Sequence, residues 1–560
     1  MNILTGTLHW NKFSSLKKNS EENFSNGFLD LHVDRIHCFK SHGKNYFHNS
    51  QNNNVCVILG YISNIREIKS KYLIESENDV EIVEKLYSTK GLDFISFLEG
   101  SFIVFIWNGK TNKGYILLDH FGSSLPVYYV FNKEKLIFST SLKEILKRMP
   151  FKRELNIPVV YDFLSYVKYS GPSPTNSTLI KHVNKLIIGQ YLHINYSKKS
   201  IKIKNFKKKE KKVSIESAKK NVMKSIQQNI ERIAKELRSK NVNHLLSSGC
   251  DSNLTLYYLS ILKDIKVTAL TIGGKKQDET RNTKLLTKSY KNIKHKIEFM
   301  DSKELNDLPD VIWRLEGAIQ SPYGSLYNLF AKKIKKNTKV VFSGMSAEFL
   351  FSTEKSSEII WFKKNLIDEL YYFRNVLFKK GLFKGLRISR ISLLKKYIKN
   401  DLLKILFYNH LQYLGSIRQG LIFNSFNVQD ILPIFNERTK VFAKPLRKLN
   451  FNRAYYEKEV KTILGKNRAQ HIQKLPIPID IEFMFENKWD AIIKFIESDF
   501  VKNILSRDYI NTMMKNPKQH LWVIFCLLYI HVFNELFVSG KFDSKFDKID
   551  FDNKLEYFLK

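Results

Sequence analysis

The sequence predicts a mixed α/β protein with a β-rich N-terminal part, a parallel α/β part after it and a helical C-terminal part. Short apolar runs of five to eight residues fill the chain up to about Tyr196, and from about Ser214 the periodicity changes to a succession of strand, helix and strand. Hydrophobic residues make up 43% of the 560 residues. A chain of this length can fold into two large domains or roughly three to four small ones, and its composition allows large cores.

The N-terminal runs predict antiparallel strands, because they are rich in Val, Ile, Phe and Tyr and are separated by Asn, Gly, Ser and Lys. The expected strands are residues 55–62, 100–107, 113–119, 127–131 and 135–140. A helix is expected at Asn78–Ser88, where the apolar residues form one stripe and Asp79 and Glu81 lie in the first turn.

The second part predicts a parallel βαβ unit. The sequence places a long amphipathic helix at residues 215–240, a strand at 244–248, a helix at 252–262 and strands at 266–272 and 340–343. The remainder is mainly helical, with a Pro-rich interruption at Leu475–Ile479. We therefore expect an N-terminal domain at residues 1–200, a basic linker at 201–213, a second domain at 214–540 and a polar tail at 541–560.

The formal net charge of +38 by itself suggests a nucleic acid or another acidic partner, since the chain has 92 Lys and Arg but 54 Asp and Glu. However, the lysines are scattered along the whole chain among many Asn, Ile and Phe, as in an AT-rich coding sequence. Nucleic-acid binding is therefore not the favoured interpretation. The densest cluster, Lys198–Lys212, is interpreted as a solvated strand edge and linker.

Cysteine usage and apolar runs predict a cytoplasmic protein without a membrane span. The four cysteines lie far apart, which fits neither a disulfide framework nor a zinc site with paired ligands. They are Cys38, Cys56, Cys250 and Cys526. The first residues lack the pattern of a secretory signal. The longest apolar run, Leu521–Ile530, is too short to cross a bilayer, so we expect it to form a buried helix.

The segment His244–Leu254 combines a hydrophobic strand, a Ser-Ser-Gly turn and the start of a helix. Such a turn directs backbone N–H groups and a helix N-terminus toward one point, which suits an anion such as pyrophosphate. The hydroxyls of Ser247, Ser248 and Ser252 can add donors. Asp251 would repel a phosphate unless a cation lies between them, which favours Mg²⁺. The alternative is that Asp251 or Ser252 only caps the helix.

This segment, SSGCDS, resembles the SGGxDS pyrophosphate loop of the asparagine synthetase-like ATP pyrophosphatases. Ser248 stands in place of the first Gly, which fits only if that position needs no positive φ. The resemblance implies a PP-loop domain of parallel α/β architecture that binds ATP and Mg²⁺. It implies nucleotide contacts from Leu246, Ser247, Ser248, Gly249, Asp251 and Ser252.

Two further segments match the same family in the expected order. Residues 267–273 resemble the strand whose end contacts adenine, which places Ile272 at the nucleotide. Residues 340–351, VVFSGMSAEFLF, resemble the family's vvLSGdGaDElF. This match implies nucleotide contacts from Ser343 and Gly344. It also implies a second Mg²⁺ ligand at Glu348, where the family usually has Asp.

Two segments closer to the C-terminus also match. Residues 427–446 resemble the family's vEvRvPFLD segment, with Ile431 and Asn436 in place of the expected Arg and Asp. Residues 468–478 resemble its Lys-bearing loop, which makes Lys474 the candidate catalytic lysine. A cation there would neutralise charge on the α-phosphate and on the leaving pyrophosphate. The alternative is that Lys474 is one more surface lysine.

Segments of the N-terminal part resemble the glutaminase domain of the family, an N-terminal-nucleophile-type fold. They are residues 59–68, 97–107 and 119–129. A glutaminase of this kind needs a thiol at residue 2, where this sequence has Asn2. Leu59 replaces the Asn that contacts glutamine, and only Gly60 and Asp79 persist among the partner sites. The resemblance therefore implies a degenerate glutaminase-like domain that does not hydrolyse glutamine.

A pyrophosphate loop with Mg²⁺ and a lysine at the α-phosphate favours attack on the α-phosphorus, which yields an acyl-adenylate and pyrophosphate. The resemblance implies an ATP- and Mg²⁺-dependent ligase that adenylates a carboxylate of the Asp or Glu side-chain type. Attack by an amine then forms an amide and releases AMP. The family includes β-lactam synthetases and lasso-peptide cyclases, which also lack the thiol, and we expect an enzyme of one of these two kinds.

Two alternatives stay open. One is an asparagine synthase that uses ammonia, or glutamine through an unrecognised site. The other is a non-catalytic relative or nucleic-acid-binding protein, which Ser248, Glu348, Ile431 and the net charge of +38 would fit. The expected partner is a small-molecule or peptide substrate with a carboxylate and an amine; a lasso-type enzyme would also meet a precursor peptide and its processing protease. Met345 stands where asparagine synthetases have Glu and β-lactam synthetases have Tyr, so no residue is assigned to the amine.

Overall fold

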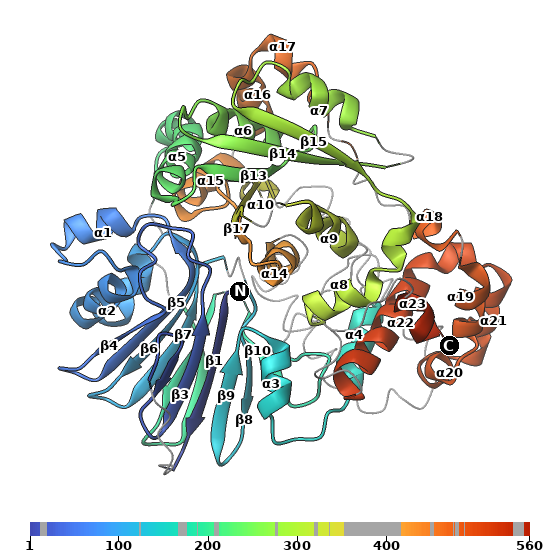
Figure 1. Ribbon diagram of the computed structural model, residues 1–560, viewed down its shortest axis with the longest axis horizontal. Helices are drawn as coiled ribbons and strands as arrows, with labels where there is room; N and C mark the ends of the chain where they lie inside the picture. Colours follow the sequence, from blue (N-terminus) through green and yellow to red (C-terminus); the bar gives the residue numbers. More distant parts are fainter. Residues whose placement is uncertain are drawn as a thin grey trace.

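The structure is a computed structural model. It describes residues 1–11, 19–121, 125–165, 176–187, 189–206, 212–274, 278–317, 323–334, 337–345, 347–351, 416–448, 453–473, 475, 481–486, 488–540 and 554–559. These residues form two antiparallel sheets from the N-terminal part and one parallel sheet from the second part, with helices of the C-terminal part at the side (Figure 1). The mixed α/β architecture is as predicted.

The two antiparallel sheets pack face to face, because apolar residues of both point into one shared core. Leu4 and Leu8 of one sheet and Val57 and Phe105 of the other are buried in it. The first sheet has the order β10 (Asn184–Lys185), β8 (Tyr128–Phe131), β9 (Lys135–Ser139), β1 (Ile3–His9), β3 (Leu29–Asp34), β2 (Asn23–Ser25). The second has the order β12 (Ser200–Asn205), β11 (Gln190–Asn195), β7 (Lys113–Leu118), β6 (Gly100–Asn108), β5 (Asn54–Ile62), β4 (Tyr46–Asn49).

The five strands expected in the N-terminal part are confirmed as β5, β6, β7, β8 and β9. The edge strand β12 continues the second sheet into the residues expected to form the linker. Helices α1 (Ile65–Lys71) and α2 (Asp79–Lys90) cover the outer face of the second sheet (Figure 1). The expected helix is confirmed as α2, and the Asn78 side chain caps it by accepting a hydrogen bond from the backbone N–H of Val80.

Short helices connect the strands of the N-terminal part and lead toward the C-terminal helices. They are η1 (Gly91–Phe97), α3 (Leu142–Arg148) and α4 (Ile157–Ser165).

The parallel sheet confirms the predicted βαβ unit. Its order is β15 (Ile293–Phe299), β14 (Lys266–Gly273), β13 (Asn241–Leu245), β16 (Val340–Ser343), β17 (Gln429–Ile431). One face packs on α5 (Ile215–Glu236), α6 (Cys250–Ser260), α15 (Glu437–Lys448) and α16 (Arg453–Leu464). The other face packs on α8 (Leu308–Leu315), α9 (Tyr323–Lys333) and α14 (Arg418–Ser425), and this layer continues into the core of the sandwich.

Smaller helices complete the second part, and further helices form the C-terminal part. The former are α7 (Thr280–Thr287), η3 (Ser302–Leu305), α10 (Ala347–Phe351) and α17 (Lys466–Ala469). The latter are α18 (Ile481–Phe485), α19 (Trp489–Ile496), α20 (Asp499–Ile504), α21 (Arg507–Lys515), η6 (Pro517–His520), α22 (Leu521–Phe533), η7 (Asn534–Val538) and α23 (Lys554–Leu559). Leu555 and Phe558 of α23, within the expected polar tail, are buried in the C-terminal core.

The apolar run around α22 is longer than the sequence analysis predicted, because η6 and η7 extend the helix at both ends. By length and composition alone, Pro517–Val538 could cross a membrane. However, 67% of its most apolar window is buried inside the protein. Side chains all around α22 pack against α4, α8 and the C-terminal helices, which favours the predicted core helix.

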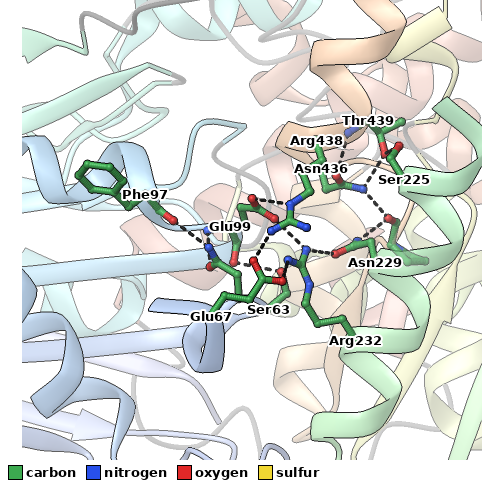
Figure 2. A network of polar contacts seen from close by, with 12 residues as sticks. Ser63, Glu67, Phe97, Glu99, Ser225, Asn229, Arg232, Asn436, Arg438 and Thr439 are labelled. Carbon is green, nitrogen blue, oxygen red and sulfur yellow. Dashed lines mark hydrogen bonds and ion pairs between the residues drawn. The ribbon is translucent and has the colours of Figure 1, made fainter. Parts of the chain in front are cut away.

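Two arginines and two glutamates join the sandwich to the parallel-sheet part (Figure 2). Glu67 of α1 and Glu99, just before β6, come from the sandwich, whereas Arg232 lies in α5 and Arg438 in α15. Arg232 Nη2 and Arg438 Nε each lie 2.8 Å from a Glu99 oxygen, and both arginines also bond Glu67. The side chain of Glu99 is 17% exposed and that of Glu67 is 50% exposed.

Asn436 lies beside this network, at a position where the family pattern has Asp. Its hydrogen bonds show how the structure accommodates an amide there. Its Nδ2 donates to the Pro433 carbonyl at 2.8 Å. Its Oδ1 accepts from the N–H of Thr439 at 3.0 Å, and both residues are labelled in Figure 2. Only an amide can donate and accept in this way, since an ionised carboxylate has no donor.

We expect the Glu99→Gln variant to lose about 1–3 kcal/mol of stability, because it removes the more buried of the two carboxylates that Arg232 and Arg438 share. The matched variant Glu67→Gln should lose under about 1 kcal/mol, because its carboxylate is more exposed to solvent. Thermal denaturation of both variants and the wild type checks this order. Equal losses for the two variants would contradict it.

Candidate functional site

The predicted phosphate loop connects β13 to α6 and is closed by its own side chains. The Ser252 hydroxyl lies 2.9 Å from the Ser247 hydroxyl and 3.0 Å from the Ser247 carbonyl. Asn253 Nδ2 donates to the carbonyls of Ser247 and Gly249. Gly249 takes the N-cap position with φ −76°. The loop is therefore a compact turn at the N-terminus of α6, as the sequence predicts, with serine and asparagine side chains fixing its carbonyl groups.

Ser248 holds the loop against two other segments. Its backbone φ is not positive, so serine fits where the family has Gly. Its N–H donates to Glu279 Oε2 at 2.8 Å, and its hydroxyl lies 3.0 Å from the same oxygen and 2.8 Å from the Gln473 carbonyl. Burial raises the pKa of Glu279. The Glu279 carboxylate thus accepts the hydrogen bonds that a phosphate at this loop would accept. The sequence analysis did not identify Glu279.

The end of β16 lies directly against the start of α6. A Cβ atom on Gly344 would be 2.5 Å from the backbone carbon of Asp251 and from the backbone nitrogen of Ser252. Only glycine permits this approach, so the structure brings Ser343 and Gly344 together with the loop, as expected. Ser343 is 3% exposed.

The neighbouring strand β14 completes this edge of the sheet. The backbone N–H of Leu246 donates to the Leu270 carbonyl at 2.8 Å, and the Thr271 hydroxyl donates to the Leu246 carbonyl at 3.0 Å. Ile272, one residue farther along β14, is 2% exposed. Leu246 and Ile272 therefore lie at adjacent carboxyl ends of parallel strands, where α/β proteins bind ligands.

Asp251 has a partner that the sequence analysis did not identify. Arg453 of α16 donates to both carboxylate oxygens, at 2.9 and 2.8 Å, and its Nε donates to Glu457 at 2.7 Å. Mg²⁺ accepts one or two protein carboxylates together with phosphate oxygens, so Asp251 is a suitable ligand in kind. The ion would share the carboxylate with Arg453 or replace it on one oxygen, because each oxygen accepts only one of the two hydrogen bonds.

The other two predicted chemical groups lie outside the described residues. Glu348 belongs to α10 (Ala347–Phe351), which begins shortly after Gly344, but its side chain is outside the described part. Lys474 is also outside it, although the neighbouring Gln473 lies at the loop through its hydrogen bonds with Ser248. Within the described residues, no group of three or more His, Cys, Asp or Glu could hold a metal ion. The assignments of Glu348 and Lys474 stay predictions.

A buried polar cluster next to the loop escaped the sequence analysis. Gln419 of α14 is fully buried, and its Nε2 donates to Ser343 Oγ at 2.9 Å and to Asp430 Oδ1 at 2.5 Å. Burial raises the pKa of Asp430 from 3.8 to about 7. Asp430 stands in β17 where the family pattern has an apolar residue, and this departure was the signal in the sequence that could have identified it.

Residue 2, the position of the expected thiol in the family, makes structural hydrogen bonds. Asn2 is 4% exposed. Its backbone N–H donates to Asn424 Oδ1 at 2.7 Å, its Nδ2 donates to Gln429 Oε1 at 3.0 Å, and its Oδ1 accepts from the Ile36 N–H at 3.0 Å. An amide engaged at all three polar groups cannot act as the nucleophile that a glutaminase needs.

We expect the Asp430→Asn variant to become more stable relative to the wild type as the pH rises. The folded-state pKa of Asp430 lies above the unfolded value, so its contribution to stability is complete below about pH 4 and is lost as the pH rises through about 7. Asn keeps an acceptor for Gln419 and cannot ionise. The difference in stability between variant and wild type should rise by about 2–3 kcal/mol between about pH 5 and about pH 8.

Thermal denaturation at the two pH values measures this difference. The exposed Asp93→Asn is the control and should show little change between them. A flat difference for Asp430→Asn would contradict the raised pKa.

Comparisons with known proteins agree with the arrangement of the chain. Residues 33–207 match the glutamine amidotransferase domain family, and residues 233–404 match the asparagine synthase family. A relative from Bacillus subtilis (strain 168), "Asparagine synthetase [glutamine-hydrolyzing] 2", is 23% identical over 55% of this chain and 43% of its own length. A second from the same strain, "Asparagine synthetase [glutamine-hydrolyzing] 1", is 25% identical over 52% of this chain and 46% of its own length. The chain thus matches somewhat less than half the length of these relatives.

Among solved structures, an allosteric regulatory enzyme of purine biosynthesis covers 53% of this chain and 74% of its own, with 11% identity and a TM-score of 0.24. Glutamine phosphoribosylpyrophosphate amidotransferase from B. subtilis has the same TM-score with 10% identity, over 52% of this chain and 75% of its own. The two domain matches and the related sequences show that the chain belongs to the asparagine synthetase-like family.

Proposed function

We propose that this protein is an ATP-dependent, AMP-forming amide ligase that adenylates a carboxylate and joins it to an amine without hydrolysing glutamine. The observation that carries the proposal is the meeting of the phosphate loop with the Ser343–Gly344 turn, while residue 2 is an amide held by hydrogen bonds. The first feature supports nucleotide chemistry. The second argues against a thiol-dependent source of ammonia.

Each group at the site has a defined task in this proposal. The loop N–H groups and the N-terminus of α6 bind the β- and γ-phosphates of ATP. Asp251 and Glu348 would hold Mg²⁺, which neutralises charge on the phosphates. Lys474 would stabilise the charge that develops at the α-phosphate when the carboxylate attacks. Ile272 would contact the adenine ring. The products are an acyl-adenylate and pyrophosphate, and attack by the amine then releases AMP.

The substrate we favour carries its carboxylate and its amine in one molecule, as in a lasso-peptide cyclase or a β-lactam synthetase. An intramolecular amine needs no delivery from a second active site, which agrees with the hydrogen bonds of Asn2. A lasso-type enzyme would also meet a precursor peptide and its protease. The second candidate is asparagine formation from aspartate and ammonia, which the names of the relatives favour.

ATP–pyrophosphate exchange with Mg²⁺ tests the adenylation step. We expect exchange that depends on a carboxylate substrate, and a loss of at least about 100-fold in Asp251→Ala, because the variant lacks the predicted metal ligand. The surface variant Asp264→Ala should keep wild-type activity. Aspartate, glutamate and peptides containing Asp or Glu are tested in turn. Stimulation by aspartate alone selects asparagine formation, and full exchange in Asp251→Ala would contradict the proposed site.

The contact between Glu279 and Ser248 generates a second expectation. A phosphate at the Ser248 N–H must replace a carboxylate, so Glu279→Gln should bind MgATP about 3- to 10-fold more tightly, since glutamine keeps the size but not the charge. Isothermal titration calorimetry measures the Kd. The neighbouring Asp278→Asn removes the same charge away from the loop and should change Kd less. Weaker binding by Glu279→Gln would show that the carboxylate supports the nucleotide.

A further inference from the structure

Ser343 is arranged to act only as a hydrogen-bond donor. Its Oγ accepts from Gln419 Nε2 at 2.9 Å and from the Met345 N–H at 3.3 Å. A serine hydroxyl has two lone pairs and one proton, so both lone pairs are in use and the proton remains. Among the residues that the structure describes, no acceptor takes that proton. Ser343 ends β16 beside the phosphate loop, where its hydroxyl can donate to a ligand oxygen.

The orientation of the Gln419 amide determines this arrangement. Both of its N–H groups are used, one on Ser343 and the other on Asp430 Oδ1 at 2.5 Å. The oxygen and nitrogen ends of an amide have nearly the same shape, so a neighbouring acceptor must decide which end faces Ser343. Asp430 supplies that acceptor. When Asp430 is ionised, the reversed amide would place its oxygen against the carboxylate oxygens, and it would also take the proton of Ser343.

The chain of polar contacts continues to the N-terminal sandwich. Gln429 Nε2 donates to the Asp430 carbonyl at 2.9 Å, and Gln429 Oε1 accepts from Asn2 Nδ2 at 3.0 Å. Asn2 also exchanges two hydrogen bonds with Asn424 of α14, the helix that carries Gln419. The helix α14, which carries Gln419, and the strand β17, which carries Asp430, are thus both hydrogen-bonded to Asn2.

We propose that Gln419 and Asp430 are positioning residues that direct the Ser343 hydroxyl toward the nucleotide, and that Asn2 fixes their far end from the sandwich. This inference rests on the proposed function and adds two residues to its site. Neither residue needs to touch the substrate. Their effect passes through Ser343 alone, so the contributions of Gln419 and Ser343 to nucleotide binding must not be independent.

Calorimetric titration of the full-length protein with MgATP tests the proposal by a double-mutant cycle. Ser343→Ala and Gln419→Met should each raise the Kd about tenfold. The double variant should bind within about twofold of either single variant, because each change removes the same contact. Asp430→Asn keeps an acceptor and should stay within about twofold of the wild type, whereas Asp430→Leu should match Gln419→Met. Melting temperatures are measured first for every variant.

Independent losses in the double variant, or a wild-type Kd in folded Gln419→Met, would overturn the proposal. If Gln419→Met does not fold, the comparison of Asp430→Asn with Asp430→Leu gives the same decision. A wild-type protein that does not bind MgATP would overturn the proposed function itself, and the two failures are thereby distinguished.

Discussion

The close contact between β16 and the start of α6 is the constraint on which the site depends. Gly344 has no side chain to separate the two backbones, and the contact brings Ser343 within reach of the loop that ends in Asp251. The parallel sheet sets the direction of this contact, because strands of one direction place their carboxyl ends at one edge. The helices on both faces of the sheet maintain that edge through two separate apolar cores.

The charges at this edge already have partners within the chain. Glu279 accepts the donors of Ser248, and Arg453 pairs with Asp251 through both oxygens. Binding of a phosphate at the Ser248 N–H would therefore exchange one partner for another, and a cation at Asp251 would compete with Arg453 for the same carboxylate. The affinity depends on the difference between the two interactions, and not on the strength of either one, because a lost hydrogen bond or ion pair offsets each new one.

The N-terminal sandwich has a structural task that does not depend on glutamine chemistry. Its core is continuous with the layer of α9 and α14 that covers one face of the parallel sheet. Without the sandwich, this apolar layer would be exposed to water, and Asn2 could not hold α14 and β17. The glutamate–arginine network fixes the second side of the same junction (Figure 2). These contacts explain why a domain with asparagine at residue 2 would be kept.

The sequence by itself determined the local elements, because strand and helix periods and turn residues act over short distances. It identified the helix α2 and the loop around Asp251. Only the tertiary structure decided the partners of these groups. Arg453 lies 202 residues from Asp251 along the chain. Gln419 lies in α14 and Asp430 in β17, and the packing of these two elements allows their hydrogen bond. Tertiary packing brings such pairs together, and the local sequence pattern around one residue does not identify its partner.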